Sequence, residues 1–111
     1  MKPIHQSALE AAVLDRFHHM YGAKGFPPAE SIQVTSRNNT GGGRYVELAC
    51  DAEVHMDDGY VDLDGSFVEM RGLPHGMMAV VLVKGGRIKL LELTVYGGDF
   101  WDGEEREWRI A

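Results

Sequence analysis

The chain has 111 residues, of which 44% are hydrophobic and 25% are charged, and its formal net charge is −6. These values are ordinary for a globular protein, so we expect a single domain over residues 1–111 rather than disorder. The acidic balance argues against nucleic acid and against anionic membrane surfaces as partners, because both bind basic faces. It is compatible with a basic protein partner, with a cationic ligand or with solubility alone.

Cysteine content and hydropathy indicate the compartment. Cys50 has no second cysteine to pair with, which is typical of proteins in a reducing environment. Residues 1–14 lack the apolar segment of a signal peptide, and the longest apolar run, residues 77–83, is too short to cross a bilayer as a helix. We therefore expect a cytoplasmic protein that does not insert into a membrane.

One helix is predicted near the N-terminus, over residues 7–21. Ser7 and Glu10 have the spacing of a capping box, in which each side chain satisfies a free N–H group at the start of a helix. Gly22 suits the left-handed residue that closes many helices, and the prolines at 27–28 prevent any continuation. Apolar side chains recur at helical spacing, at Leu9, Val13, Phe17 and Met20.

The rest of the chain is predicted to form an antiparallel sheet over residues 32–96. Alternating polar and apolar residues, separated by glycine-rich and aspartate-rich turns, indicate short strands. The clearest feature is a hairpin, in which Gly85 and Gly86 supply the two-residue turn. Its first arm is almost entirely apolar, so we expect it to be buried on both faces. The expected strands are 32–37, 45–50, 61–63, 67–70, 78–83 and 88–96, with a loop at 72–76.

A helix followed by a run of strands predicts an α+β fold, in which the helix packs on one face of a mostly antiparallel sheet. The C-terminal tail, residues 99–111, carries Trp101 and Trp108, and we expect these large side chains to dock it onto the body. Tyr96, Phe100 and the two tryptophans could instead form a hydrophobic surface for a partner, since tyrosine and tryptophan are favoured at interfaces. Both interpretations remain open from the sequence.

An acidic tract between two expected strands is a candidate cation site. Asp51, Glu53, His55 and Asp57 would share one face if this segment were a strand. Carboxylates and an imidazole together are suitable ligands for a divalent cation. A solvated sheet face is the simpler explanation of the alternation, so we assign no metal and no cofactor.

Two arginines, Arg37 and Arg44, flank the glycine-rich turn 38–43. Such a turn could bind an anion or a carboxylate, although it lacks the lysine and the helix of a phosphate-binding loop. A hairpin tip is the simpler interpretation, because asparagine and glycine favour turns.

Glu92 lies inside the clearest strand, where its side chain points away from those of Leu91 and Leu93. If the helix covers that face, Glu92 is a buried acid that needs a partner, with Arg37, Arg44 and His75 as the candidates. If the face is open, Glu92 is an ordinary surface residue. A structural ion pair is favoured over a catalytic acid, because such pairs are common outside active sites.

From residue 32 onward the chain resembles small uncharacterised bacterial proteins of about this length. The matching features are an R-x-x-T-G-x-G stretch at 37–43, a G-R-I-x-x-L-E-x-x-x-Y-G hairpin at 86–97 and the loop at 73–76. The resemblance implies the sheet but carries no established activity, so no catalytic residue is transferred. Similar hairpins occur among small bacterial immunity-type proteins, which act by binding a partner.

Two functional hypotheses follow. The first is a non-catalytic interaction module that binds another protein, with a homodimer through the expected edge strand 32–37 as a further option. The second is a small enzyme or small-ligand binder, with its site between helix and sheet. The residues assigned to a ligand or partner are Arg37, Arg44, His75, Glu92, Tyr96, Trp101 and Trp108.

Overall fold

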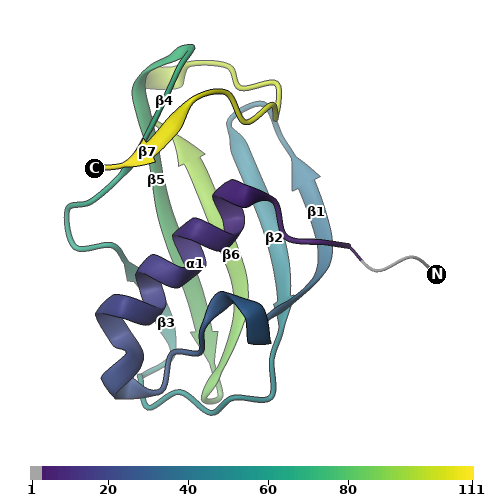
Figure 1. The fold of residues 1–111 in the computed structure, drawn as a ribbon, viewed down its shortest axis with the longest axis vertical. Helices are drawn as coiled ribbons and strands as arrows, with labels where there is room; N and C mark the ends of the chain where they lie inside the picture. Colours follow the sequence, from purple (N-terminus) through teal and green to yellow (C-terminus); the bar gives the residue numbers. More distant parts are fainter. Residues whose placement is uncertain (1–3) are drawn as a thin grey trace.

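The computed structural model describes residues 4–111, so residues 1–3 of the segment inspected for a signal peptide lie outside it. One helix, α1 (Ala8–Tyr21), packs on one face of a seven-stranded antiparallel sheet, which confirms the predicted α+β fold. In Figure 1, α1 lies in front of the sheet and crosses its strands obliquely. Within the described residues, no helix is long and apolar enough to span a membrane.

The sheet has the strand order β1-β2-β6-β5-β4-β7, and β3 also pairs with β5. The long strand β5 is central, because its first part pairs with β4 and its second part with β3, while β6 lies along its other side. Three short helical turns complete the chain, namely η1 (Gly22–Lys24), η2 (Ala29–Ser31) and η3 (Tyr96–Gly98). The strands are β1 (Gln33–Asn39), β2 (Gly43–Ala49), β3 (Gly59–Asp62), β4 (Val68–Met70), β5 (Leu73–Lys84), β6 (Arg87–Val95) and β7 (Trp108–Ile110).

Helix α1 begins and ends where the sequence predicts, but the conformation of Gly22 after its last residue differs from the prediction. Ser7 and Glu10 form the capping box, with the Ser7 hydroxyl accepting from the Glu10 N–H and the Glu10 carboxylate accepting from the Ser7 N–H. Gly22 keeps a right-handed conformation, because the chain continues into η1, and Gly25 supplies the left-handed residue instead. The left-handed conformation predicted for Gly22 was therefore wrong, and it occurs instead at Gly25, after the short turn η1.

The β5–β6 hairpin is formed as predicted, with positive φ angles at Gly85 and Gly86. On the other side of β6, strand β2 pairs closely because Gly43 has no side chain. A Cβ atom on Gly43 would lie 1.9 Å from the Leu93 carbonyl oxygen, so any other residue would push the two strands apart. This close pairing joins the hairpin to β2 and β1 as one continuous sheet.

Two sequence predictions about the strands need correction. The expected loop at 72–76 is mostly strand, because β5 begins at Leu73 and absorbs Pro74, His75 and Gly76 in an irregularity opposite β4. The expected double-sided burial of residues 78–83 is also wrong. Their side chains alternate between fully buried and half-buried along the strand, so one face of β5 is covered and the other is open.

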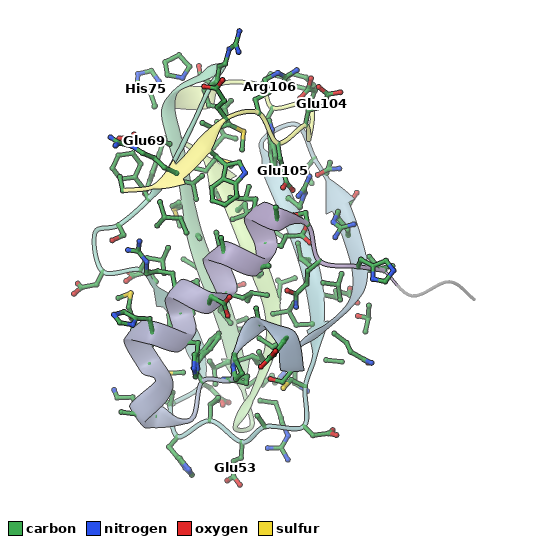
Figure 2. The ribbon with its side chains drawn as sticks, in the orientation of Figure 1. Glu53, Glu69, His75, Glu104, Glu105 and Arg106 are labelled. Carbon is green, nitrogen blue, oxygen red and sulfur yellow. The ribbon has the colours of Figure 1, made fainter. Side chains whose placement is uncertain are left out.

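Ion pairs buried beneath α1 tie the helix to β1, β2 and the C-terminal tail. Glu10 is 0% exposed, and its carboxylate accepts from Arg37 (Nη2–Oε1 2.5 Å, Nε–Oε2 2.6 Å) and from Arg44 (Nη1–Oε2 3.1 Å). Arg44, which is 4% exposed, also donates to the Glu105 carboxylate at 2.6 Å. Glu105 in turn accepts from the Leu9 N–H, and Figure 2 shows it pointing toward the first turn of α1. The two acids and two arginines balance in charge.

Trp101 closes this network from the tail. It is 2% exposed, its ring centroid lies 4.6 Å from the Arg44 guanidinium carbon, and its indole N–H donates to the Glu104 carbonyl. A cation over an aromatic face is attracted by the ring electrons, most strongly where water is excluded. Further along, β7 pairs with β4. The tail therefore packs on the body through both Trp101 and β7.

Glu10→Gln tests the buried network. The substitution leaves Arg37 and Arg44 facing a neutral amide, and a buried charge without its partner destabilises a fold by about 3 kcal/mol or more. We expect a loss of this size in the free energy of unfolding, measured by chemical denaturation. The matched control is Glu69→Gln, which removes the exposed partner of Arg109 and should leave the free energy of unfolding nearly unchanged. Equal effects of the two substitutions would contradict the role given to Glu10.

The same carboxyl predicts a dependence of stability on pH. Burial alone would raise the pKa of Glu10, but hydrogen bonds from Arg37 and Ser7 and the charges of Arg37 and Arg44 lower it below the ordinary value of 4.5. A lowered pKa in the folded state contributes stability that is complete above the ordinary pKa and disappears as the pH falls through the folded value.

The difference in unfolding free energy between the wild type and Glu10→Gln should therefore be largest near neutral pH and should shrink in acid. Denaturation curves recorded as the pH is lowered measure it. A difference that stays constant over this range would show that ionisation of Glu10 contributes nothing.

Candidate functional site

The sheet has an inner face beneath α1 and an outer face that points away from it. The inner side chains of β5 and β6 belong to the buried core. The outer side chains are half-buried and are not among the residues that pack against that core. The apolar outer residues of these two strands are Met78, Val80, Leu82 and Leu90.

Strand pairing arranges the outer side chains in rows across the sheet. Each row has an exposed tyrosine at one end and an acidic residue at the other; the centre of the first row is apolar, and the centre of the second row pairs Glu92 with Val80. From β2 through β6 and β5 to β3, one row is Glu47, Leu90, Leu82 and Tyr60. The next row is Tyr45, Glu92, Val80 and Asp62.

The two tyrosines are the most exposed apolar groups of this surface. Tyr45 is 43% exposed and Tyr60 is 59% exposed. Neither was singled out from the sequence, although the alternation of Tyr45 with Val46 already places Tyr45 on the outer side. The outer face of the sheet thus presents these two tyrosines, the apolar centre formed by Val80, Leu82 and Leu90, and the acidic residues of the two rows.

Glu92 lies half-buried within the outer face, so the open-face interpretation of this residue holds. Tyr60 reaches it from β3. A hydrogen bond with Glu92, followed by the negative charge of that carboxylate, raises the pKa of the Tyr60 phenol. None of the ion pairs found among residues 4–111 includes Glu92. The partners considered from the sequence lie elsewhere.

Arg37 and Arg44, which flank the glycine-rich turn, both lie on the inner side of the sheet. There they form ion pairs with Glu10, and Arg44 forms a further one with Glu105. Arg44 also donates to the Asn39 side chain at 2.7 Å and to the Gly103 carbonyl at 2.7 Å. These contacts occupy its guanidinium group. The two arginines therefore stabilise the fold and offer no open anion site.

His75 lies near the start of β5, on the side of the sheet toward β4, and close to Glu69 in Figure 2. Its Nδ1 atom is 3.2 Å from the Asp99 carboxylate, and its side chain is largely exposed. His75 and Trp108 line an open surface hollow of about 690 Å³, together with the exposed Glu69–Arg109 pair. Glu92, Arg37 and Arg44 take no part in this hollow, so these three side chains and His75 do not line it together.

The aromatic residues of the tail divide into buried and exposed ones. Trp101 is buried in the network beneath α1, and Trp108 is half-buried and packs against the core. Phe100 is 76% exposed and Tyr96 is 42% exposed. The expected surface built on the two tryptophans is thus absent from the described structure, and the aromatic groups that lie on an open apolar surface are Tyr45 and Tyr60.

The acidic tract at 51–57 is not a strand, so its side chains do not share one face. The segment is irregular and is held by hydrogen bonds from Val54 N–H to the Gly86 carbonyl and from His55 N–H to the Lys24 carbonyl. Among residues 4–111, no three histidine, cysteine, aspartate or glutamate side chains are grouped so that they could hold a metal ion.

Titration of Tyr60 tests the arrangement on the outer face. Because Glu92 raises the pKa of Tyr60, the substitution Glu92→Gln should lower that pKa toward the ordinary value for tyrosine. NMR of ring-labelled tyrosine as the pH is raised measures it, with Tyr21 as an internal reference because its pKa is raised by burial and by Asp62 and Asp64. An unchanged Tyr60 titration would mean that Glu92 and Tyr60 do not interact in solution.

On the outer face, apolar, aromatic and acidic groups meet without a covering element from residues 4–111. Comparison of the chain with protein-family models, with curated proteins and with solved structures found no match. Its function is accordingly argued from its own residues.

Proposed function

We propose that this protein is a non-catalytic interaction module that binds another protein through the outer face of its sheet. One observation carries the proposal. Val80, Leu82 and Leu90 lie side by side on paired strands, half-buried, yet outside the core. Contiguous apolar surface of this kind marks interaction sites, because leaving it in water is unfavourable.

The composition of the outer face supports a protein partner. Interfaces combine an apolar centre with tyrosine and tryptophan anchors and a polar rim. Here Tyr45 and Tyr60 lie beside the apolar centre, and Glu47 and Asp62 lie at the ends of the rows. A paired sheet presents a broad surface, which suits a protein better than a small molecule that needs a concave site.

The distribution of the other candidate residues speaks against a small-ligand or enzyme site between helix and sheet. Arg37 and Arg44 are bound within the buried network, His75 pairs with Asp99, and Glu92 lies on the outer face. A catalytic site needs its groups within hydrogen-bonding reach of one substrate. These four residues occupy three separate places.

The wider setting is part of the same proposal. A chain with one cysteine fits a reducing compartment such as the cytoplasm. The hairpin shared with small bacterial immunity-type proteins supports a role that consists of binding a partner. No catalytic residue and no cofactor is assigned.

The test is quantitative capture of partners from an extract of the native host by the tagged full-length protein. The double variant Tyr45→Ser/Tyr60→Ser should retain at least about tenfold less of the captured partner, since losing interface anchors costs about 1–2 kcal/mol each. The matched control is Phe100→Ser, which removes a still more exposed aromatic ring outside the outer face. It should retain the partner at the wild-type level.

Thermal melts of all three proteins establish that each is folded. A partner retained equally by wild type and double variant would reject the outer face as the binding surface. A partner lost only from Phe100→Ser would move the binding surface to the tail.

A further inference from the structure

We infer that the outer face recognises a positively charged side chain of its partner, an arginine or a lysine, at a site formed by Tyr45, Glu92 and Tyr60. The inference rests on the proposed function, because it names the partner chemistry of the same surface. It is carried by the position of one carboxylate among apolar and aromatic neighbours and by the charge of the surrounding surface.

Glu92 lies between an aromatic and an apolar neighbour. It pairs with Tyr45 of β2 on one side and with Val80 of β5 on the other. Directly paired residues have Cβ atoms about 5 Å apart, close enough for side-chain contact. The Glu92 carboxylate therefore has an apolar neighbour, Val80, on one side and an aromatic neighbour, Tyr45, on the other.

Tyr60 completes the site from the opposite side. It pairs with Leu82, in the row next to that of Val80 and Glu92, so it lies on the β3 side of the same surface. Tyrosines of β2 and β3 thus flank Glu92 and Val80 on the two sides of the central strands. The Glu92 carboxylate forms no ion pair among residues 4–111, so it keeps acceptor positions for an incoming donor.

The charges around the site favour a cation. Glu47 and Asp62 lie in the same two rows, and neither forms an ion pair among residues 4–111. Among residues 4–111, the Asp62 carboxylate accepts one local hydrogen bond, from the Asp64 N–H. The basic groups nearest along the two central strands are Lys84, Arg87 and Lys89, at the hairpin end of β5 and β6 beyond the apolar centre. The middle of the face is therefore acidic, in a chain whose net charge is −6.

Arginine and lysine match this surface in both of their parts. Their aliphatic stems cover apolar groups while the charged end reaches a carboxylate. A guanidinium can also donate two hydrogen bonds to one carboxylate and stack on a tyrosine ring. A second copy of this chain is a poorer occupant, because it would bring Glu47 and Glu92 and the same negative net charge against themselves.

The direct test is an NMR titration of the full-length protein with the capped peptide acetyl-Gly-Arg-Gly-amide and with its lysine analogue. The neutral control peptide carries citrulline, which has nearly the shape of arginine without its charge. We expect saturable shifts of the backbone signals of Tyr45, Tyr60 and Glu92 with the charged peptides and at least about fivefold weaker binding of the citrulline peptide. Equal binding of charged and neutral peptides, or shifts located elsewhere, would overturn the inference.

Variants separate the charge from the rings. Glu92→Gln should weaken binding of the arginine peptide at least about fivefold, and Tyr60→Phe should weaken it less, because the ring remains. The matched control is Glu30→Gln, which removes the same charge from exposed η2 on the inner side of the sheet. It should bind as the wild type does. Unchanged binding by Glu92→Gln would overturn the inference.

Partner capture distinguishes failure of this inference from failure of the proposed function. If Tyr45→Ser/Tyr60→Ser releases the partner while Glu92→Gln retains it fully, the outer face binds a protein and charge recognition is rejected. If neither variant releases the partner, both proposals are rejected. Sedimentation equilibrium covers the remaining occupant, since a dimer that Tyr45→Ser/Tyr60→Ser dissociates would place a second copy on the face and overturn the inference.

Discussion

The pairing of the Glu10 carboxylate with Arg37 and Arg44 is the interaction on which the arrangement of the molecule depends. Glu10 belongs to the first turn of α1, Arg37 to β1 and Arg44 to β2, so one buried acid fixes the start of the helix over the edge of the sheet. Burying these charges is costly unless each one is paired and hydrogen-bonded. Here the two arginines are balanced by Glu10 and Glu105, and the indole ring of Trp101 lies against Arg44; these contacts offset the cost of burial. Helix, edge strands and tail are therefore assembled around the same group.

Fixing α1 in this way decides which side of the sheet is covered. The helix buries Leu9, Val13, Leu14 and Phe17 against the inner face, and β7 extends the sheet beside β4. With the helix and its following turn η2 on one side, as Figure 1 shows, the outer side chains of β5 and β6 keep their access to solvent. The open outer face is thus a consequence of the network, although no residue of the network contributes to it.

Features that depend on neighbouring residues were predicted well from the sequence, but the long-range contacts of the same residues were not. The Ser7–Glu10 capping box and the Gly85–Gly86 hairpin depend on neighbours in the chain, and both are present. The second role of Glu10 depends on arginines more than 25 residues away, and capping patterns contain no signal for it. Likewise, the alternation in β6 separated Glu92 from Leu91, but it did not decide which of the two sides the helix covers.

The loop predicted at 72–76 failed for a related reason. Proline and two glycines normally interrupt strands, and the local composition outweighed everything else in the prediction. In the folded chain an irregularity opposite β4 accommodates Pro74 and Gly76, so the strand starts at Leu73. Strand β4, which pairs with β5, and strand β7, which pairs with β4 on its other side, are too short for their pairing to be predicted from the sequence. The hydrophobicity of the residues also did not distinguish the two sides of β5, because Met78, Val80 and Leu82 on one side are as apolar as Ala79, Val81 and Val83 on the other. A strand that is apolar on both sides is normally covered on both sides. Residues 4–111 cover only one side of β5, which is the strongest reason to look for the second cover in another molecule.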